Sequence, residues 1–202
     1  MVTVLAVGAH PDDIEVGCAG TLALQKSNGG KVYFLVLSRG EASGDPGTKE
    51  LACKESAELL GVDGLFFGGL KDTKIYEGIE TILVIEKIIE KVDPDIVYTH
   101  TFKDTHQDHR NTAYATLSAA RRCKRILMYE TPNTLKEFFP QVFVDIEKTF
   151  EVKKKALRVF GRESERFWLA ANAVEGLAVF RGFQAGVHAA EAFEVGRFVL
   201  EV

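Results

Sequence analysis

The stretch Gly8-Ala9-His10-Pro11-Asp12-Asp13-Ile14-Glu15 directly follows a short apolar run, residues 2–7, near the start of the chain. That run is rich in β-branched residues, which predicts a buried strand. Residues 16–24 have helical spacing, so the acidic stretch lies at a strand-to-helix turn, where open α/β sheets bind their ligands. One imidazole and three carboxylates within six residues have the spacing of a metal site. Alternatively, the carboxylates only complement the positive end of the following helix.

A second polar cluster, Asp-Thr-His-Gln-Asp-His-Arg-Asn at residues 104–111, follows another apolar run at 96–100. It precedes a predicted helix over residues 112–122. If the two preceding strands are parallel neighbours, both clusters meet at the same edge of the sheet. A merely solvated loop would have to arise independently at both places, which favours one shared site.

The composition is typical of an ordinary globular domain. The chain has 202 residues, 46% hydrophobic and 27% charged, which is enough for one good core and marginal for two. Its net charge of −4 argues against a general nucleic-acid binder, which needs a basic surface. The basic cluster at residues 121–125 closes a predicted helix, where cations complement the helix dipole.

The cysteines and the N-terminus indicate a cytoplasmic protein. Cys18, Cys53 and Cys123 are odd in number and lack CxxC spacing, which fits buried thiols in a reducing compartment. No basic segment precedes the first apolar run, and that run is too short to span a membrane.

The order of the predicted elements indicates an α/β fold with a mostly parallel sheet and helices on both faces. Nothing resembles a linker or a repeat, so residues 1–202 are expected to form a single domain. Trp168 is assigned to the core. The glycines match neither a dinucleotide fingerprint nor a Walker loop, and no GxSxG elbow is present. Strands are predicted at 2–7, 31–37, 65–67, 95–99, 126–129 and, at the periphery of the sheet, 142–146; helices at 16–24, 48–60, 78–92, 112–122, 146–160 and 163–180; and a mixed tail at 187–202.

The two clusters together have the residues for a hydrolytic metal site. Zinc in a hydrolase typically takes three protein ligands and leaves one position for water or substrate. His10 and Asp13, three residues apart at a turn, can point to one atom, and His109 can complete the set. Asp12 would then lie beside the metal and accept a proton from the metal-activated water.

His106 is the second candidate for proton transfer. It lies three residues before His109, with Asp108 available to fix its tautomer or raise its basicity. As an imidazolium it can stabilise an oxyanion or protonate a leaving amine. Water activation combined with carbonyl polarisation is the chemistry of amide hydrolysis.

Four segments resemble the motifs of the PIG-L/LmbE-like N-acetylglucosaminyl deacetylases. The first is Ala9-His10-Pro11-Asp12-Asp13-Ile14-Glu15-Val16-Gly17-Cys18-Ala19-Gly20-Thr21-Leu22, and the second is His106-Gln107-Asp108-His109-Arg110. Ser38-Arg39-Gly40-Glu41 and the segment from Arg181 to Phe193 are also similar to motifs of that family. The resemblance extends from residue 4 to residue 193, and the two His/Asp motifs together are highly specific.

The resemblance implies a zinc-dependent deacetylase with a Rossmann-like fold that removes acetate from the 2-amino group of a glucosamine derivative. By position, the ligands are His10, Asp13 and His109, the general base is Asp12, and His106 with Asp108 is the electrostatic pair. Arg39 corresponds to a substrate-facing arginine. The chain departs from the family pattern at Ala189, where tyrosine is expected, and at Ala19, where glycine is usual.

Several assignments stay open from the sequence. Glu15 is either an ordinary acid of a first helical turn or a partner of a metal ligand. His100 is expected to fill a sheet-edge position. His188 is a candidate substrate-binding residue in a tail that the pattern does not place. The expected partner is a small N-acetylated amino-sugar substrate. Neither a nucleic acid nor a membrane span is expected, and the protein is expected to form a homo-oligomer.

Two other functions compete with sugar deacetylation. One is a different metal-dependent amidase or hydrolase, acting on a non-sugar amide or an ester. The other is a protein that holds a metal without turnover. A mere metal holder would not need Asp12 and His106, which weighs against the latter.

Overall fold

The computed structural model describes residues 1–161 and 165–200, and of residues 165–170 only the backbone. The helix start expected at Glu163 and the core position expected for Trp168 therefore lie outside the described residues. The elements in chain order are β1 (Thr3–Gly8), α1 (Asp13–Ser27), β2 (Lys31–Val36), α2 (Pro46–Leu59), β3 (Gly64–Phe67), α3 (Ile79–Val92), β4 (Ile96–His100), α4 (Gln107–Ala119), β5 (Arg125–Tyr129), β6 (Val142–Asp145), the short 3₁₀ helix η1 (Glu147–Thr149), α5 (Phe150–Phe160), α6 (Glu165–Ala185) and β7 (Ala190–Phe198).

Within the described residues, seven strands form one sheet in the order β3-β2-β1-β4-β5-β7-β6. The first five of these are parallel, and β7 is antiparallel to both of its neighbours. This confirms the α/β class, the mostly parallel sheet and the peripheral position of residues 142–145. The carboxyl ends of β1 and β4, adjacent strands, lie at one edge, as the two polar clusters require.

The expectation of a mixed tail was wrong for residues 190–198, which form the strand between β5 and β6. This strand buries Glu191 and Glu194 together with Ala192 and Phe193. The buried carboxylates have partners on other elements: Lys153 pairs with Glu191, and Thr101 donates to Glu194. Two buried acids interrupt the apolar pattern by which an interior strand is recognised in sequence.

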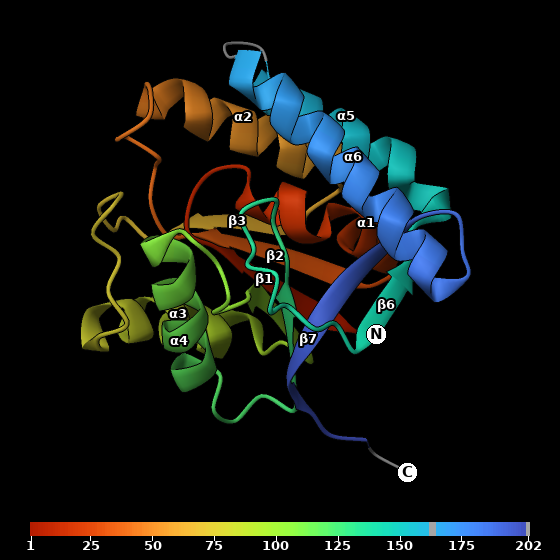
Figure 1. Ribbon diagram of the computed structural model, residues 1–202. Helices are drawn as coiled ribbons and strands as arrows, with labels where there is room; N and C mark the ends of the chain where they lie inside the picture. Colours follow the sequence, from red (N-terminus) through yellow and green to blue (C-terminus); the bar gives the residue numbers. More distant parts are fainter. Residues whose placement is uncertain (162–164, 201–202) are drawn as a thin grey trace.

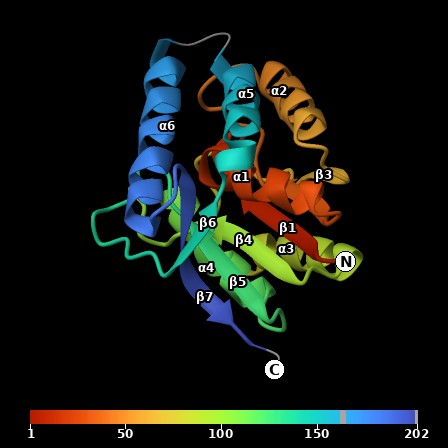
Figure 2. The ribbon, with the colours of Figure 1, turned by 90° about the vertical axis from the view of Figure 1, so that its right-hand side faces the viewer.

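Helices cover both faces of the sheet, with α1, α2, α5 and α6 on one side and α3 and α4 on the other (Figures 1 and 2). Because side chains alternate along a strand, β1 contributes to two separate cores. Val4 and Ala6 pack against α1, α2 and α5, whereas Leu5 and Val7 pack against α3 and α4. The central strand is therefore buried on both faces, which holds its carboxyl end in place.

Several helices begin at residues other than the expected ones; α1, for example, begins at Asp13 rather than at residue 16. Helix α4 begins at Gln107 with His106 as its N-cap, not at residue 112, so the second cluster lies on the first helical turn. Helix α2 begins at Pro46 rather than at residue 48, and Asp45 caps it, because Oδ2 of Asp45 accepts a hydrogen bond from the Thr48 backbone N–H at 2.7 Å. Polar residues in a first turn are easily read as loop, because they lack apolar periodicity.

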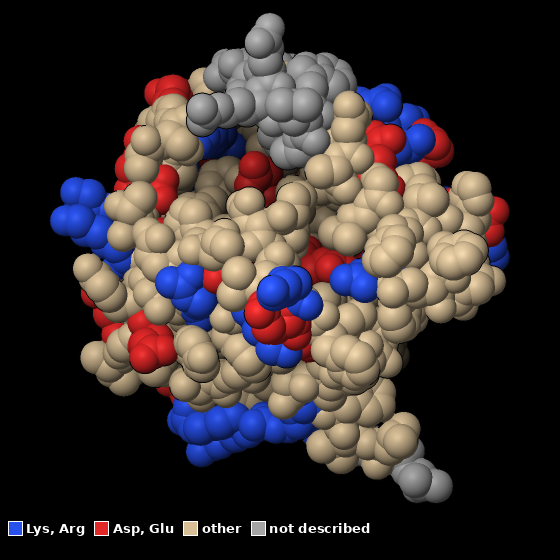
Figure 3. Space-filling model, viewed as in Figure 1, with Lys and Arg blue, Asp and Glu red and all other residues tan. Residues whose placement is uncertain are grey.

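Basic side chains gather at the edge of the molecule where α4 turns into β5 (Figures 1 and 3). Arg197 from β7 donates hydrogen bonds to the carbonyl oxygens of Ala120, Arg121 and Cys123 at the end of α4. Of the cluster at 121–125, Arg121 donates a hydrogen bond to the Ser118 carbonyl oxygen near the end of α4, where a cation complements the helix dipole. No described helix is long and apolar enough to cross a membrane.

Close packing of α1 on β5 gives a prediction at Gly17. A Cβ atom there would lie 2.1 Å from Cδ2 of Tyr129, whereas a Cβ at Gly176 on α6 would have no neighbour within 4 Å. We expect Gly17→Ala to destabilise the protein by about 1–3 kcal/mol through overpacking. Gly176→Ala, the matched control, should stabilise it by about 0.5–1 kcal/mol through helix propensity. Urea denaturation of the two variants measures both values, and equal effects would contradict the packing argument.

Candidate active site

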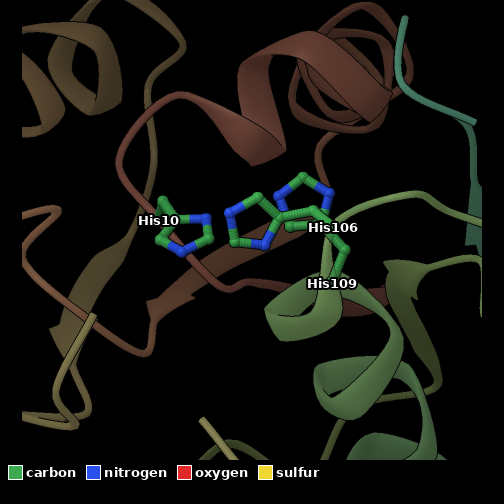
Figure 4. A group of neighbouring side chains, drawn as sticks. All are labelled: His10, His106 and His109. Carbon is green, nitrogen blue, oxygen red and sulfur yellow. The ribbon is translucent and has the colours of Figure 1, made fainter. Parts of the chain in front are cut away.

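The two polar clusters meet at the edge of the sheet between β1 and β4. The loop after β1 contributes His10, and the start of α4 contributes His106 and His109 (Figure 4). The ring centroids lie 4.8 Å apart for His10 and His106, 4.7 Å for His106 and His109, and 5.3 Å for His10 and His109. Segments about a hundred residues apart in sequence therefore build one site.

Asp13, buried at the start of α1, lies at the centre of this group. Its Oδ2 accepts a hydrogen bond from the His10 backbone N–H at 2.7 Å and lies 3.0 Å from Nε2 of His100. Its Oδ1 lies 3.2 Å from Nε2 of His109. Burial alone would raise the pKa of Asp13, but the charges of His109 and His100 hold this pKa well below its ordinary value. Asp13 is therefore a carboxylate in the folded protein.

A second carboxylate orients His109. Oδ2 of Asp104 lies 3.1 Å from Nδ1 of His109 and accepts a hydrogen bond from the Thr131 hydroxyl at 2.8 Å. This contact turns Nε2 of His109 toward Asp13. Burial would lower the pKa of His109, but Asp13 and Asp104 outweigh it and raise the pKa to about 9. Asp104 stands in the second cluster, yet its spacing alone assigned it no role.

Two further carboxylates contact the other side of His10. Nε2 of His10 lies 3.1 Å from Oδ1 of Asp72 and 3.1 Å from Oδ2 of Asp108. Burial would lower the pKa of His10, but Asp108 and Asp13 raise it to about 10. Sequence reasoning missed Asp72, which lies in the loop between β3 and α3. Its position just beyond a third parallel strand, at the same edge, is the signal that could have identified it.

His106 and Asp108 interact differently from the expected pair. Nδ1 of His106 accepts a hydrogen bond from the backbone N–H of Asp108 at 3.2 Å, whereas the carboxylate of Asp108 contacts His10 and the Thr73 backbone N–H. Burial and the positive charges of His109 and His10 lower the pKa of His106. With Nδ1 accepting, the neutral ring carries its proton on Nε2.

Two acids near Asp13, the half-buried Asp12 and the buried Glu15, have raised pKa values. Asp12 caps α1 with a positive φ of 92°, a backbone conformation that non-glycine residues adopt mainly under tertiary constraint. Burial, followed by the charges of Asp13 and Glu15, raises the pKa of Asp12 to about 8. Burial raises the pKa of Glu15 to about 7, although the Ser56 hydroxyl donates to its Oε1 at 2.6 Å.

The other expected residues lie outside this cluster. His100 at the end of β4 is fully buried and stacks on His109 with ring centroids 4.1 Å apart, so it belongs to the site more closely than expected. Arg39 follows β2 at the same edge and is exposed, with Nε 3.6 Å from Oε2 of Glu50. His188 is exposed in the turn between α6 and β7.

The donors of the cluster fit a divalent metal ion. Among the described residues, three sets have donor atoms within 4.8 Å of one another: His10–His106–His109, Asp13–His100–His109 and His10–Asp72–Asp108. Oδ1 of Asp108 is buried without a hydrogen-bond partner, which a cation would relieve. The expected ligands His10 and His109 each lie against Asp13. Imidazole and carboxylate together suit zinc and related transition metals.

Residues 5–120 match the family model described as PIG-L, GlcNAc-PI de-N-acetylase. This range runs from β1 to the end of α4 and includes both His/Asp clusters. The chain belongs to this family, as its motifs indicated.

Individual relatives agree with this membership. The uncharacterized deacetylase YaiS of Escherichia coli (strain K12) is 36% identical over 164 residues, covering 77% of this chain and 88% of the relative. The diacetylchitobiose deacetylase of Thermococcus kodakarensis is 28% identical over 223 residues, covering 97% of this chain and 82% of the relative. The crystal structure of the conserved protein TT1542 from Thermus thermophilus superposes with a TM-score of 0.91 at 26% identity. The match covers 100% of this chain and 98% of that protein. The matches to the last two cover 97% and 100% of this chain.

The raised pKa of Glu15 predicts a pH-dependent stability. Its pKa is about 7 in the folded protein against 4.5 ordinarily. The stability that the protonated Glu15 carboxyl group contributes is therefore fully present below pH 4.5 and is lost as pH rises through 7. Glu15→Gln removes this loss. We expect the stability of the variant relative to the parent to increase by about 3 kcal/mol between pH 4 and pH 8. Urea denaturation in the presence of a chelator measures it, and parallel pH curves would contradict the burial argument.

Proposed function

We propose that this chain is a zinc-dependent hydrolase that removes the N-acetyl group from an N-acetylglucosaminyl-type substrate. The observation that carries the proposal is the buried Asp13 carboxylate held among His10, His100 and His109, with a second acid, Asp12, directly beside it. Such a group of donors next to a proton acceptor has the parts needed for amide hydrolysis.

The proposed ligands are His10, Asp13 and His109. Asp104 supports His109 as a ligand, because its Oδ2 lies 3.1 Å from Nδ1 while Nε2 faces Asp13. A zinc ion bound there would polarise the acetamide carbonyl and lower the pKa of water.

Asp12 is the proposed general base. A pKa of about 8 makes its carboxylate a good proton acceptor near neutral pH. His106 is the proposed partner of the reacting amide. Because its Nδ1 accepts from Asp108, its Nε2–H is available as a donor to the carbonyl oxygen or the departing amine. Asp108 contributes by holding the His106 ring with its backbone and His10 with its carboxylate.

The proposed substrate is a small N-acetylated amino sugar. Arg39, exposed on the loop after β2, is the proposed contact for its polar groups, and His188 is a weaker candidate because it lies beyond α6. The deacetylase of Thermococcus kodakarensis named for diacetylchitobiose supports this substrate class.

The proposed location is the cytoplasm, which the three free, buried cysteines support. The proposed single domain over residues 1–202 is supported by the one sheet that the described residues form.

Removal of a ligand should abolish metal binding and activity together. We expect His10→Ala and His109→Ala each to lower the zinc bound per chain, because each removes one of three ligands. Elemental analysis after dialysis, alongside acetate release, measures both. Full zinc content in both variants would refute the ligand assignment.

The function itself is tested with a panel of N-acetylglucosaminyl compounds, non-sugar acetamides and acetate esters, by measuring released acetate. We expect turnover of the sugar amides. Asp12→Asn should retain zinc but lose about 10²–10⁴-fold in rate, because it removes the general base. Preference for a non-sugar amide or an ester would overturn the substrate class, and near-normal turnover by zinc-loaded Asp12→Asn would overturn the role of Asp12.

A further inference from the structure

Helix α1 is interrupted directly behind the site. The backbone leaves the helical conformation at Cys18, with φ −150° and ψ 15°. An interruption leaves carbonyl groups before it and N–H groups after it without helical partners. Because Gly17, Cys18, Ala19 and Gly20 are all buried, these groups need other partners within the protein.

A buried ion pair from the C-terminal part of the chain supplies these partners. Glu191 on β7 accepts hydrogen bonds from the backbone N–H groups of Gly20 at 2.9 Å and Thr21 at 2.7 Å. Lys153 on α5 donates to the carbonyl oxygen of Val16 at 2.7 Å and also to Glu191. Only 2% of the Lys153 surface and 4% of the Glu191 surface are exposed. Each charge thus lies at the helix end of opposite partial charge.

The part of α1 before the interruption carries the acids of the site. It contains Asp13 and Glu15, and Asp12 is its N-cap. The first turn can therefore take a direction different from that of the part that packs on the sheet. Close approach of Tyr129 to Gly17, and of Ile146 to Gly20, fixes the small residues on either side of the interruption.

We propose that Lys153 and Glu191 are positioning residues for the reaction: they hold the interrupted α1 so that Asp12 and Asp13 face the histidines. The catalytic part of this inference rests on the proposed function. A buried ion pair is in general a poor source of stability, which makes a geometric role the better explanation of this one. Both residues lie outside the matched range 5–120, so the C-terminal part of the chain also builds the site.

The double variant Lys153→Met/Glu191→Gln tests this role in the full chain. It removes both charges at once, so that no lone charge stays buried. Circular dichroism first establishes that it folds. We expect its zinc affinity, measured by competition with a chromophoric chelator, to fall about 10- to 100-fold, as for other residues that orient metal ligands. We expect kcat to fall as well, with KM close to that of the parent.

A second ion pair, between the buried Glu130 and the partly buried Arg181, provides the control. Nε and Nη2 of Arg181 on α6 each donate to a carboxylate oxygen of Glu130 at 2.6 Å. Neither of these hydrogen bonds involves α1. Arg181→Met/Glu130→Gln should therefore lower the Tm but leave zinc affinity and kcat unchanged.

The outcomes separate the two proposals. A folded Lys153→Met/Glu191→Gln variant with the zinc affinity and kcat of the parent overturns the positioning role, as do equal losses in both double variants. If the double variant does not fold, Glu191→Gln alone is compared with Glu130→Gln by the same criteria. If the parent releases no acetate from any N-acetylglucosaminyl compound, the proposed function fails, while zinc affinity still decides the positioning role.

Discussion

The burial of one carboxylate, that of Asp13, is the constraint on which this edge of the sheet depends. A carboxylate removed from water is costly unless charged or hydrogen-bonding groups surround it. His109 and His100 supply that surrounding, and the backbone of His10 adds a hydrogen bond. The imidazoles then need acids of their own, with Asp104 behind His109 and Asp72 beside His10. Acid and imidazole therefore alternate, and each of these carboxylates lies against a histidine.

Asp12 and Asp13 show how much two adjacent acids can differ. Burial acts to raise the pKa of both. Asp13 lies against the imidazoles, and its pKa is held well below the ordinary value. Asp12 experiences the repulsion of Asp13 and Glu15, and its pKa is raised to about 8. A permanently charged acid beside one that exchanges a proton near neutral pH is an arrangement typical of catalytic pairs, and it supports the roles proposed here.

Much of the fold and part of the site could be predicted from sequence. The apolar runs before His10 and before the second cluster indicated parallel strands, and these are the neighbours β1 and β4. The spacing of His10, Asp13 and His109 indicated groups that the fold does bring together. Asp72 could not be found in this way, because it stands alone in its segment. Strand β7 was missed, because its buried acids Glu191 and Glu194 hide an apolar pattern.

The sequence by itself determined the order of strands and helices as far as α6, the two polar clusters and the family, because hydrophobic periodicity and motif spacing are local properties of the chain. Only the tertiary structure decided which atoms face each other. The carboxylate of Asp108 contacts His10 rather than its neighbour His106, and Lys153 and Glu191 meet at the interruption of α1. Such contacts follow from the packing of distant segments, and a buried charge is satisfied by whichever partner that packing places within reach.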